Sequence, residues 1–265
     1  MKKNQIFSIL FIFLSLQLVK TTISEAVEKK AENEIILIGT GEWQPYHSLK
    51  LKHFGVGTHI VEEAFKAAGM KVEFKFRPWK RLLSESDNNR IDGIAVWGGY
   101  EAWIDTHYGS DPLYDGSFVF WMRKGTELDW RNTEELKGLR IGLLIGEEMP
   151  VQLQDADKKG YLRVSKVATT KQNIKMLLSN RIDLIALNYD VGIEVMKNTL
   201  SASEREKIVA HPDPLRVSLY RVLFNKKNGE KSVRLLDALN TRLYLLRRNG
   251  KIEKMLEASR RGEYK

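Results

Sequence analysis

One short segment occurs twice in the chain in almost the same form, and this repeat constrains the fold more than any other feature. Residues 89–95 read NRIDGIA, and residues 180–186 read NRIDLIA. Each copy follows a stretch with helical spacing of apolar residues and leads into an apolar run typical of a buried strand. The repeat therefore predicts two similarly built lobes. The alternative is that a polar turn before a strand is simply a common local solution.

Short β-type segments alternate with helical ones along the chain, which is typical of α/β folds. Residues 35–38 form a continuous apolar run, as expected of a buried parallel strand. Residues 58–69 repeat apolar side chains at helical spacing, with Thr58 as a possible cap, and residues 71–76 alternate strictly. Strand, helix and strand in this order predict a right-handed crossover unit.

A second such series begins after residue 125. In it, the segment around Thr169 is expected to cap a helix, and this helix leads into a strand predicted at residues 182–187.

Two later segments indicate how the lobes are connected. Residues 217–224 read as a strand, and residues 231–254 as an amphipathic helical region. If the strand returns the chain to the first lobe, two extended segments join the lobes, as in a clamp that closes about a hinge. We therefore expect residues 33–120 and 219–265 to form lobe 1, and residues 121–218 to form lobe 2.

The N-terminus is typical of a secretory signal peptide. Lys2 and Lys3 precede an apolar run at residues 6–19, and cleavage is expected after Ala26. The run is shorter than the roughly 20 residues that a membrane-spanning helix needs. The absence of cysteine excludes disulfides, thiolate metal sites, a cysteine nucleophile and a lipoprotein anchor. We predict a signal peptide at residues 1–26 and a soluble periplasmic protein without a lipid anchor, with full export as the alternative.

Several classes of site find no support in the sequence. The turn at residues 39–41 lacks the third glycine of a dinucleotide-binding loop, and neither a nucleophile-elbow serine nor a His-Glu-x-x-His motif occurs. The net charge of +9 is spread along the chain without an aromatic platform, which argues against nucleic acid. His47, His53 and His59 are spaced six residues apart, which could indicate a metal cluster, but we interpret them as surface histidines. We expect neither a metal nor a cofactor.

Tryptophans gather at the predicted strand ends and loops of the first lobe. They are Trp43, Trp79, Trp97 and Trp103, with Tyr46 nearby. The carboxyl ends of parallel strands are where open α/β sheets bind ligands, and aromatic rings there offer stacking faces or a cage for a cation. Each ring alone could equally belong to the core, but the group predicts a ligand cleft.

Six motifs in order resemble the type II periplasmic solute-binding proteins, specifically the polar amino-acid-binding components of ABC importers. They are EWQPY (42–46), PWKR (78–81), RIDG (90–93) and SDPLY (110–114), then EELKGLRIG (134–142) and RID (181–183). The resemblance extends from residue 34 to about residue 260. It implies two Rossmann-like lobes joined by a two-stranded hinge. It also implies closure on a small polar ligand that is delivered to an ABC permease or a membrane sensor.

The chain departs from this family where the ligand is normally held. The family's carboxylate-binding arginine would fall within residues 100–104, which contain none. Its ammonium-binding aspartate falls on Asn188, and its small hydroxyl residues in lobe 2 fall on Glu147 and Glu148. A carboxylate at those positions repels an anionic ligand and suits a cationic or hydroxyl-rich one.

Two interpretations of the altered site follow. Either Arg81 or Arg77 replaces the missing arginine, or the ligand is not an ordinary amino acid. We favour the second interpretation, with an amine, a polyamine, a cationic metabolite or a sugar-like molecule as the ligand. Asp92 and Asp183 are interpreted as structural residues that hold the turn into each strand. The predicted ligand-binding residues are Trp43, Tyr46, Trp79, Arg81, Trp97, Gly98 and Trp103 in lobe 1, and Glu147, Glu148 and Asn188 in lobe 2.

The sequence thus predicts a monomeric binding protein without catalytic residues and without a nucleic-acid partner. One alternative is an enzyme on the same fold, similar to dehydratases, with Glu147 or Glu148 as its general acid or base. Another is a sensor or scaffold protein that has lost its ligand.

Overall fold

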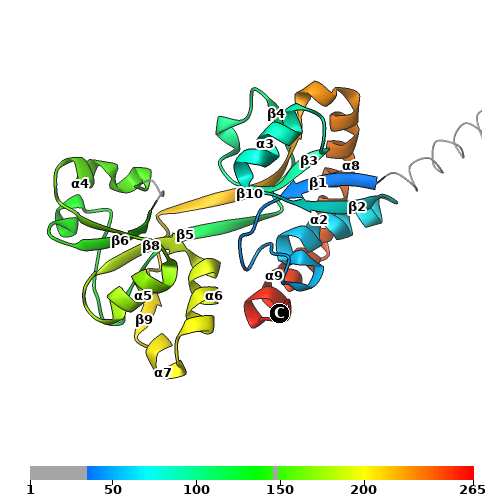
Figure 1. Ribbon diagram of the computed structural model, residues 1–265. Helices are drawn as coiled ribbons and strands as arrows, with labels where there is room; N and C mark the ends of the chain where they lie inside the picture. Colours follow the sequence, from blue (N-terminus) through cyan, green and yellow to red (C-terminus); the bar gives the residue numbers. More distant parts are fainter. Residues whose placement is uncertain (1–34, 146–148) are drawn as a thin grey trace, which may run out of the picture.

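The computed structural model describes residues 35–145 and 149–265. These residues form two lobes connected by β5 and β10 (Figure 1). The predicted α/β class and the two-lobed layout are confirmed. The strands are β1 (Ile35–Thr40), β2 (Lys71–Phe76), β3 (Gly93–Trp97), β4 (His107–Gly109), β5 (Tyr114–Arg123), β6 (Arg140–Leu144), β7 (Arg163–Val167), β8 (Leu184–Asn188), β9 (Ile208–Ala210) and β10 (Arg216–Asn225).

The helices cover the sheets of both lobes. The α-helices are α2 (Val56–Ala67), α3 (Trp79–Asp87), α4 (Gln154–Lys158), α5 (Thr170–Leu178), α6 (Tyr189–Thr199), α7 (Ala202–Arg205), α8 (Glu230–Arg248) and α9 (Lys251–Arg261). The 3-10 turns are η1 (Lys52–Phe54), η2 (Tyr100–Ala102), η3 (Thr133–Leu136), η4 (Val151–Leu153) and η5 (Lys226–Asn228). None of the helices in the described ranges is long and apolar enough to cross a membrane.

Lobe 1 is built from two separate stretches of chain. Its strands run in the order β2-β1-β3-β10, and β1 pairs in parallel with both β2 and β3. The core combines side chains of α2, such as Phe65, with side chains of α8 and α9, such as Leu239 and Ile252. The segment that follows β10 therefore returns to lobe 1 and completes its core.

Lobe 2 has a sheet that is covered on both faces. Its strands run in the order β5-β8-β6-β7, with β6 parallel to β7 and β8. Along β5, Phe120 packs into one core with Ile141, whereas Trp121 packs into a second core with Leu177. Because successive side chains of a strand point to opposite faces, these two cores lie on opposite sides of one sheet.

The two copies of the repeat occupy equivalent places. Each lies between a helix, α3 or α5, and a strand, β3 or β8. Asn89 and Asn180 both adopt the left-handed region, with φ of 55° and 57°. Gly39 on β1 and Gly142 on β6 also correspond, because a Cβ on either would lie within 2.7 Å of the isoleucine of its own repeat. The prediction of two similarly built lobes is confirmed.

The aspartates of the repeat tie neighbouring strands together. Asp92 Oδ2 accepts a hydrogen bond from Leu37 N–H at 2.9 Å, and Asp92 N–H donates to the Leu37 carbonyl at 2.7 Å. Asp183 and Arg140 repeat the same pair of bonds at 3.0 and 2.7 Å. The interpretation of both aspartates as structural residues is therefore confirmed.

Some local expectations hold and others do not. Thr169 caps α5 in a full capping box with Gln172, as the sequence predicts. Thr58 does not cap α2, which begins earlier, at Val56; its hydroxyl donates instead to the Gly55 carbonyl at 2.9 Å, inside the first turn. Gly55 starts the helix because its φ of 109° is accessible to glycine.

Two long strands connect the lobes. Residues 114–118 of β5 pair in antiparallel register with residues 216–220 of β10. Beyond this shared segment, β10 continues into the lobe 1 sheet beside β3, and β5 continues into the lobe 2 sheet beside β8. The connection is thus a paired ribbon whose two ends belong to different lobes (Figure 1).

Candidate functional site

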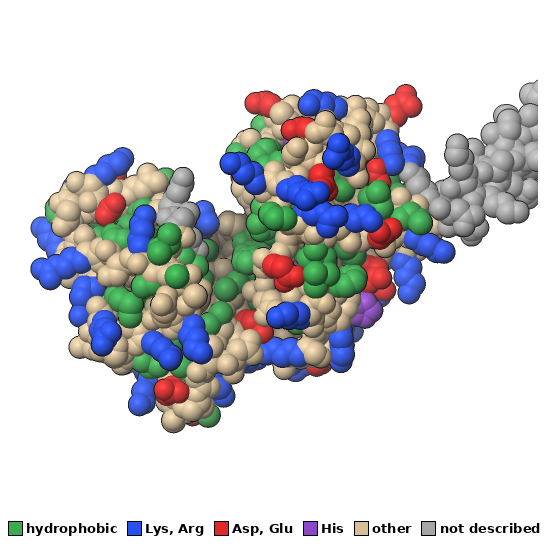
Figure 2. Space-filling view, in the orientation of Figure 1, with side chains coloured by type: hydrophobic (Ala, Val, Ile, Leu, Met, Phe, Trp, Pro, Cys, Tyr) green, Lys and Arg blue, Asp and Glu red, His purple; other side chains and the backbone are tan. Residues whose placement is uncertain are grey.

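A cavity of about 680 Å³ opens between the ends of β1 and β3 and the connecting strand β10. Figure 2 shows a hollow between the lobes with hydrophobic side chains on its surface. The cavity lies at the carboxyl ends of the parallel strands of lobe 1, the edge where such sheets bind ligands. It is lined by Trp43, Trp79, Val96, Trp97, Gly98, Gly99, Glu101, Arg216, Val217, Ser218, Leu219 and Tyr220.

The aromatic rings that line this cavity pack against neighbouring rings. The Trp79 and Trp97 rings meet edge to face, with centroids 5.3 Å apart and an interplanar angle of 81°. Trp43 lies 5.1 Å from Tyr220 and 4.7 Å from Tyr46. Such contacts fix the rings in place before any ligand arrives. The wall can therefore offer rigid apolar faces and the negative π surfaces that attract cations.

The loop after β1 is folded tightly enough to hold Trp43 at the cavity. Trp43 N–H donates to the His47 carbonyl at 2.8 Å, and Tyr46 N–H donates to the Trp43 carbonyl at 3.0 Å. Gly41 is needed in this loop, because a Cβ there would lie 2.5 Å from the Trp79 ring. The glycine thus allows Trp79 to lie directly against the backbone.

His47 supports the same loop from inside. It is completely buried, and its Nδ1 lies 2.6 Å from the Gly41 carbonyl oxygen. Burial lowers the pKa of His47 to about 4, so the imidazole is neutral at pH 7 and Nδ1 is the donor. The interpretation of His47 as a surface histidine is wrong. The sequence spacing could not show that the loop folds over it.

Two groups of opposite charge border the cavity. Glu101 lies in η2, and Arg216 begins β10 with its guanidinium 4.8 Å from the centre of the Phe118 ring. Both side chains belong to exposed residues. Neither was singled out from the sequence. The available signal for Arg216 was its position directly before the predicted crossing strand at residues 217–224, since such a strand borders a cleft between lobes.

Tyr46 and Asn188 lie where the lobes touch rather than on the cavity wall. The Tyr46 hydroxyl donates to Asp190 Oδ2 at 2.8 Å and lies 3.2 Å from Asn188 Oδ1. Asn188 also caps α6, since its Oδ1 accepts from Val191 N–H at 3.1 Å. Burial and the neighbouring Asp190 carboxylate raise the pKa of Tyr46 far above its usual value, so the phenol stays protonated.

A further ion pair joins the lobes at this contact. Arg260 of α9 in lobe 1 places its Nε 2.8 Å from Asp190 Oδ1. Side-chain exposure is 8% for Asp190 and 49% for Arg260. The carboxylate raises the pKa of the Arg260 guanidinium. Asp190 thus receives donors from two separate elements of lobe 1.

The arginines expected to replace the family's carboxylate clamp pair with Glu85 and do not line the cavity. Arg81 Nε lies 2.8 Å from Glu85 Oε1, four residues further along α3, and the Arg81 side chain is 62% exposed. Arg77 Nε lies 3.7 Å from the same carboxylate oxygen. Neither arginine is among the residues that line the cavity. Arg216 is the arginine that does line it.

The remaining predicted residues are placed as follows. Trp103 packs behind Trp97, with ring centroids 5.5 Å apart and an interplanar angle of 79°. It supports the aromatic wall without lining the cavity. Gly98 lines the cavity directly. Glu147 and Glu148 lie outside the described residues.

Comparisons with known proteins give relatives of one kind. No protein-family model matches the chain. The L-cystine-binding protein TcyA of Bacillus subtilis (strain 168) is 23% identical over 234 residues, which cover 87% of this chain and 81% of TcyA. The probable amino-acid-binding protein YxeM of the same organism is 20% identical over 232 residues, which cover 86% of this chain and 84% of YxeM.

A solved structure has a similar fold over a similar share of the chain. The L-cystine solute receptor of Neisseria gonorrhoeae in its unliganded open conformation matches with a TM-score of 0.65 and 16% identity, covering 86% of this chain and 93% of the receptor. The resemblance to solute-binding proteins and the fold that it implies are confirmed. The relatives named here are binding proteins.

Proposed function

We propose that this chain is a solute-binding protein of an ABC importer and that it captures a small amino-acid-like solute in the cavity beside β10. The cavity itself carries the proposal, because aromatic walls at the strand ends are combined with one cation and one anion at the rim. Its volume of about 680 Å³ lies within the range of roughly 300–1,000 Å³ found for small-molecule sites. The two amino-acid-binding relatives support the same class of solute.

In this proposal Arg216 replaces the arginine that residues 100–104 lack. A guanidinium presents several N–H donors in a fork that matches a carboxylate, and the Phe118 ring below it restricts its orientation. Glu101 supplies the opposite charge for an ammonium group. Trp43, Trp79 and Trp97 contact the remainder of the solute, with the Gly98 backbone beside them.

The lobes then act as a clamp. Rotation about the paired ribbon of β5 and β10 brings lobe 2 over the cavity, and the contact of Tyr46 with Asn188 and Asp190 positions the lobes. Glu147 and Glu148 remain proposed ligand contacts from lobe 2. The protein works as a monomer in the periplasm after removal of residues 1–26 and passes its solute to a permease.

A thermal-shift screen tests the function. L-cystine represents neutral amino acids and L-arginine cationic amino acids, whereas spermidine represents polyamines and glucose represents sugars. A ligand at 100 times its Kd stabilises the folded protein by about 2.7 kcal/mol, which raises Tm by a few degrees. We expect a shift with at least one amino acid. No shift with any of these classes would count against the proposal, and chemical conversion of a stabilising compound would favour an enzyme.

Matched variants locate the site. Arg216→Ala should lower the affinity for a carboxylate-bearing solute at least tenfold. Arg163 is an exposed arginine of β7, and Arg163→Ala should leave this affinity unchanged. Trp97→Ala should likewise weaken binding, with Trp130→Ala in lobe 2 as the control. If Arg81→Ala, rather than Arg216→Ala, removes binding, the cavity assignment is wrong and the sequence-based expectation is preferred.

A further inference from the structure

Two histidines and a glutamate meet on lobe 1, away from the cavity. His53 Nδ1 lies 3.1 Å from Glu62 Oε2. The imidazole rings of His53 and His59 are stacked, with centroids 3.8 Å apart and an angle of 6° between their planes. One possible ligand atom from each of the three residues lies within 4.8 Å of the other two. Figure 2 shows histidine surface on the side of lobe 1 that faces away from lobe 2.

The local backbone produces this arrangement. His59 and Glu62 are three residues apart on α2 and therefore share one face of the helix. His53 and Phe54 both have positive φ, 50° and 59°, which turns the chain back toward that face. The Thr58 hydroxyl proton is shared between the Gly55 carbonyl at 2.9 Å and the His53 carbonyl at 2.8 Å, and this contact holds the turn against the helix.

A neighbouring hydroxyl orients one of the imidazoles. The Tyr264 hydroxyl lies 2.6 Å from His59 Nδ1, which leaves Nε2 of this ring to act as a ligand. Partners of this kind fix the ring orientation of metal-bound histidines. Tyr264 is itself held in place, because its carbonyl accepts from Lys52 N–H at 2.8 Å.

We propose that His53, His59 and Glu62 bind one divalent transition-metal ion of the zinc type. Two imidazoles and a carboxylate, with a water in the fourth position, are a common ligand set for zinc. For tetrahedral bonds of about 2.0–2.1 Å, ligand atoms lie about 3.3 Å apart. The 3.1 Å between His53 and Glu62 is already close to that separation. Their side chains are 51% and 42% exposed, so an ion can enter from solvent.

The spacing of His47, His53 and His59 could indicate a metal cluster, but the sequence alone favours surface histidines. The structure removes His47 from the group, because it is buried under its own loop, and brings in Glu62 from α2. An ion bound here would join η1 to α2. Because Ser48 N–H donates to the Phe54 carbonyl at 2.7 Å, the ion would also restrain the loop that carries Trp43.

Titration of the untagged full chain with Zn²⁺ tests the proposal, with a chromophoric chelator as competitor. We expect one ion per chain. His53→Ala, His59→Ala and Glu62→Gln should each raise the Kd at least tenfold. Glu253→Gln, an exposed carboxylate of α9, is the matched control and should leave the Kd unchanged. Circular dichroism of each variant checks that it is folded.

Tyr264→Phe distinguishes a built site from loose surface binding. It removes the hydroxyl that orients His59 but leaves all three ligands, and loss of such a partner typically weakens metal binding 10–100-fold. The visible spectrum of bound Co²⁺ should show tetrahedral coordination in the wild type. The proposal is overturned if the wild type binds no Zn²⁺, or if Zn²⁺ binds the three ligand variants as tightly as the control.

Discussion

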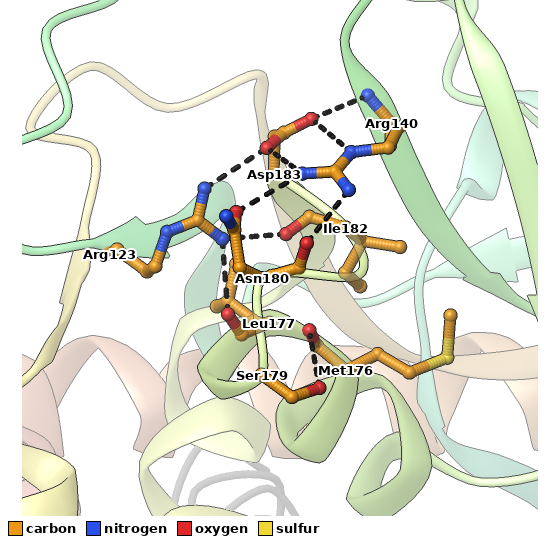
Figure 3. A network of polar contacts seen from close by, with 8 residues as sticks. All are labelled: Arg123, Arg140, Met176, Leu177, Ser179, Asn180, Ile182 and Asp183. Atoms are coloured by element: carbon orange, nitrogen blue, oxygen red, sulfur yellow. Dashed lines mark hydrogen bonds and ion pairs between the residues drawn. The ribbon is translucent and has the colours of Figure 1, made fainter.

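Lobe 1 and lobe 2 use one aspartate each to tie the repeat to a neighbouring strand, but they surround that aspartate differently. In lobe 1, Asp92 accepts a backbone N–H of β1 and pairs with Lys231 at 2.6 Å. In lobe 2, Asp183 accepts a backbone N–H of β6 and pairs with Arg123 at 3.0 Å and Arg140 at 2.7 Å. Figure 3 shows both guanidinium groups directed at this one carboxylate.

The arginines of lobe 2 also bind the turn itself. Arg123 Nη1 donates to the Ile182 carbonyl at 2.7 Å and to the Leu177 carbonyl at 3.0 Å (Figure 3). Arg140 Nη1 donates to the Asn180 carbonyl at 2.7 Å. The bonds to the two guanidiniums hold the pKa of Asp183 well below its usual value. Both lobes therefore have the hydrogen bond from the aspartate to the neighbouring strand, whereas the contact of the aspartate with two guanidinium groups is found in lobe 2.

Removing each aspartate should show this difference most clearly. Asp183→Ala leaves two guanidiniums without their carboxylate, and we expect it to lower the free energy of unfolding by about 3 kcal/mol. Asp92→Ala should cost about 1.5 kcal/mol, because it mainly leaves one backbone donor unpaired. Urea unfolding measures both, with the exposed Asp157→Ala as control. Equal losses of unfolding free energy at the two positions would mean that the contacts of Asp183 with the two arginines do not stabilise the protein.

The pH dependence isolates the charge of Asp183. Because its pKa is lowered on folding, the ionised carboxylate stabilises the protein above its unfolded pKa of about 4, and this stabilisation is lost as the pH falls further. Asp183→Asn should therefore lower the free energy of unfolding at pH 6 relative to the wild type. This loss should be smaller than the loss caused by Asp183→Ala. The difference should shrink steadily below pH 4 in urea titrations. A difference that stays constant down to pH 2 would contradict this.

The lobes also differ at the residue that ends the repeat's strand, five positions after the aspartate. This is Trp97 in lobe 1, on the cavity wall, and Asn188 in lobe 2, beside Tyr46. Tyr46→Phe should cost about 1.5 kcal/mol, because Asp190 loses a buried donor. The exposed Tyr244→Phe is the control. A double-mutant cycle of Tyr46→Phe with Asn188→Ala should give a non-zero coupling energy, and full additivity would show that Tyr46 and Asn188 do not interact.

The smallest expected difference concerns the asparagines with positive φ. Asn89→Ala and Asn180→Ala should each cost about 1 kcal/mol, since alanine is disfavoured in the left-handed region. Glycine should restore stability at position 89 but only in part at 180. The reason is that Asn180 Oδ1 accepts from Arg140 Nη2 at 3.1 Å, whereas the described residues give no such bond to the Asn89 side chain. If glycine restored full stability at both positions, the hydrogen bond between Asn180 and Arg140 would not contribute to stability.

Much of the fold followed from patterns within single segments. The strict alternation of residues 71–76 predicted β2 with the correct bounds, and Thr169 predicted the start of α5. The capping position of α2 was missed, because Gly55 and the turn before it depend on contacts with the loop at Tyr46. Similarly, β8 begins at Leu184 rather than Ile182, since the first residues of that apolar run form the turn around Asp183.

The residues of the candidate site also divide into those that local sequence patterns predicted and those that depend on long-range contacts. Trp43, Trp79 and Trp97 were identified because their position at strand ends is a local property. Arg216 was missed because it reaches the cavity only through the pairing of β10 with β5, which joins residues far apart in the sequence. The burial of Tyr46 between lobes likewise depends on α6, which follows much later in the chain.

The two-part construction of lobe 1 has a consequence for how the protein is made. Lobe 2 lies between β5 and β10 and is continuous, so a growing chain contains all of its core once β10 has been synthesised. The core of lobe 1 still lacks α8 and α9 at that point, and β1 to β3 were made first. The portion synthesised first is thus the last to complete its packing. During synthesis, β1 to β3 would therefore remain without part of their core until α8 and α9 had been added.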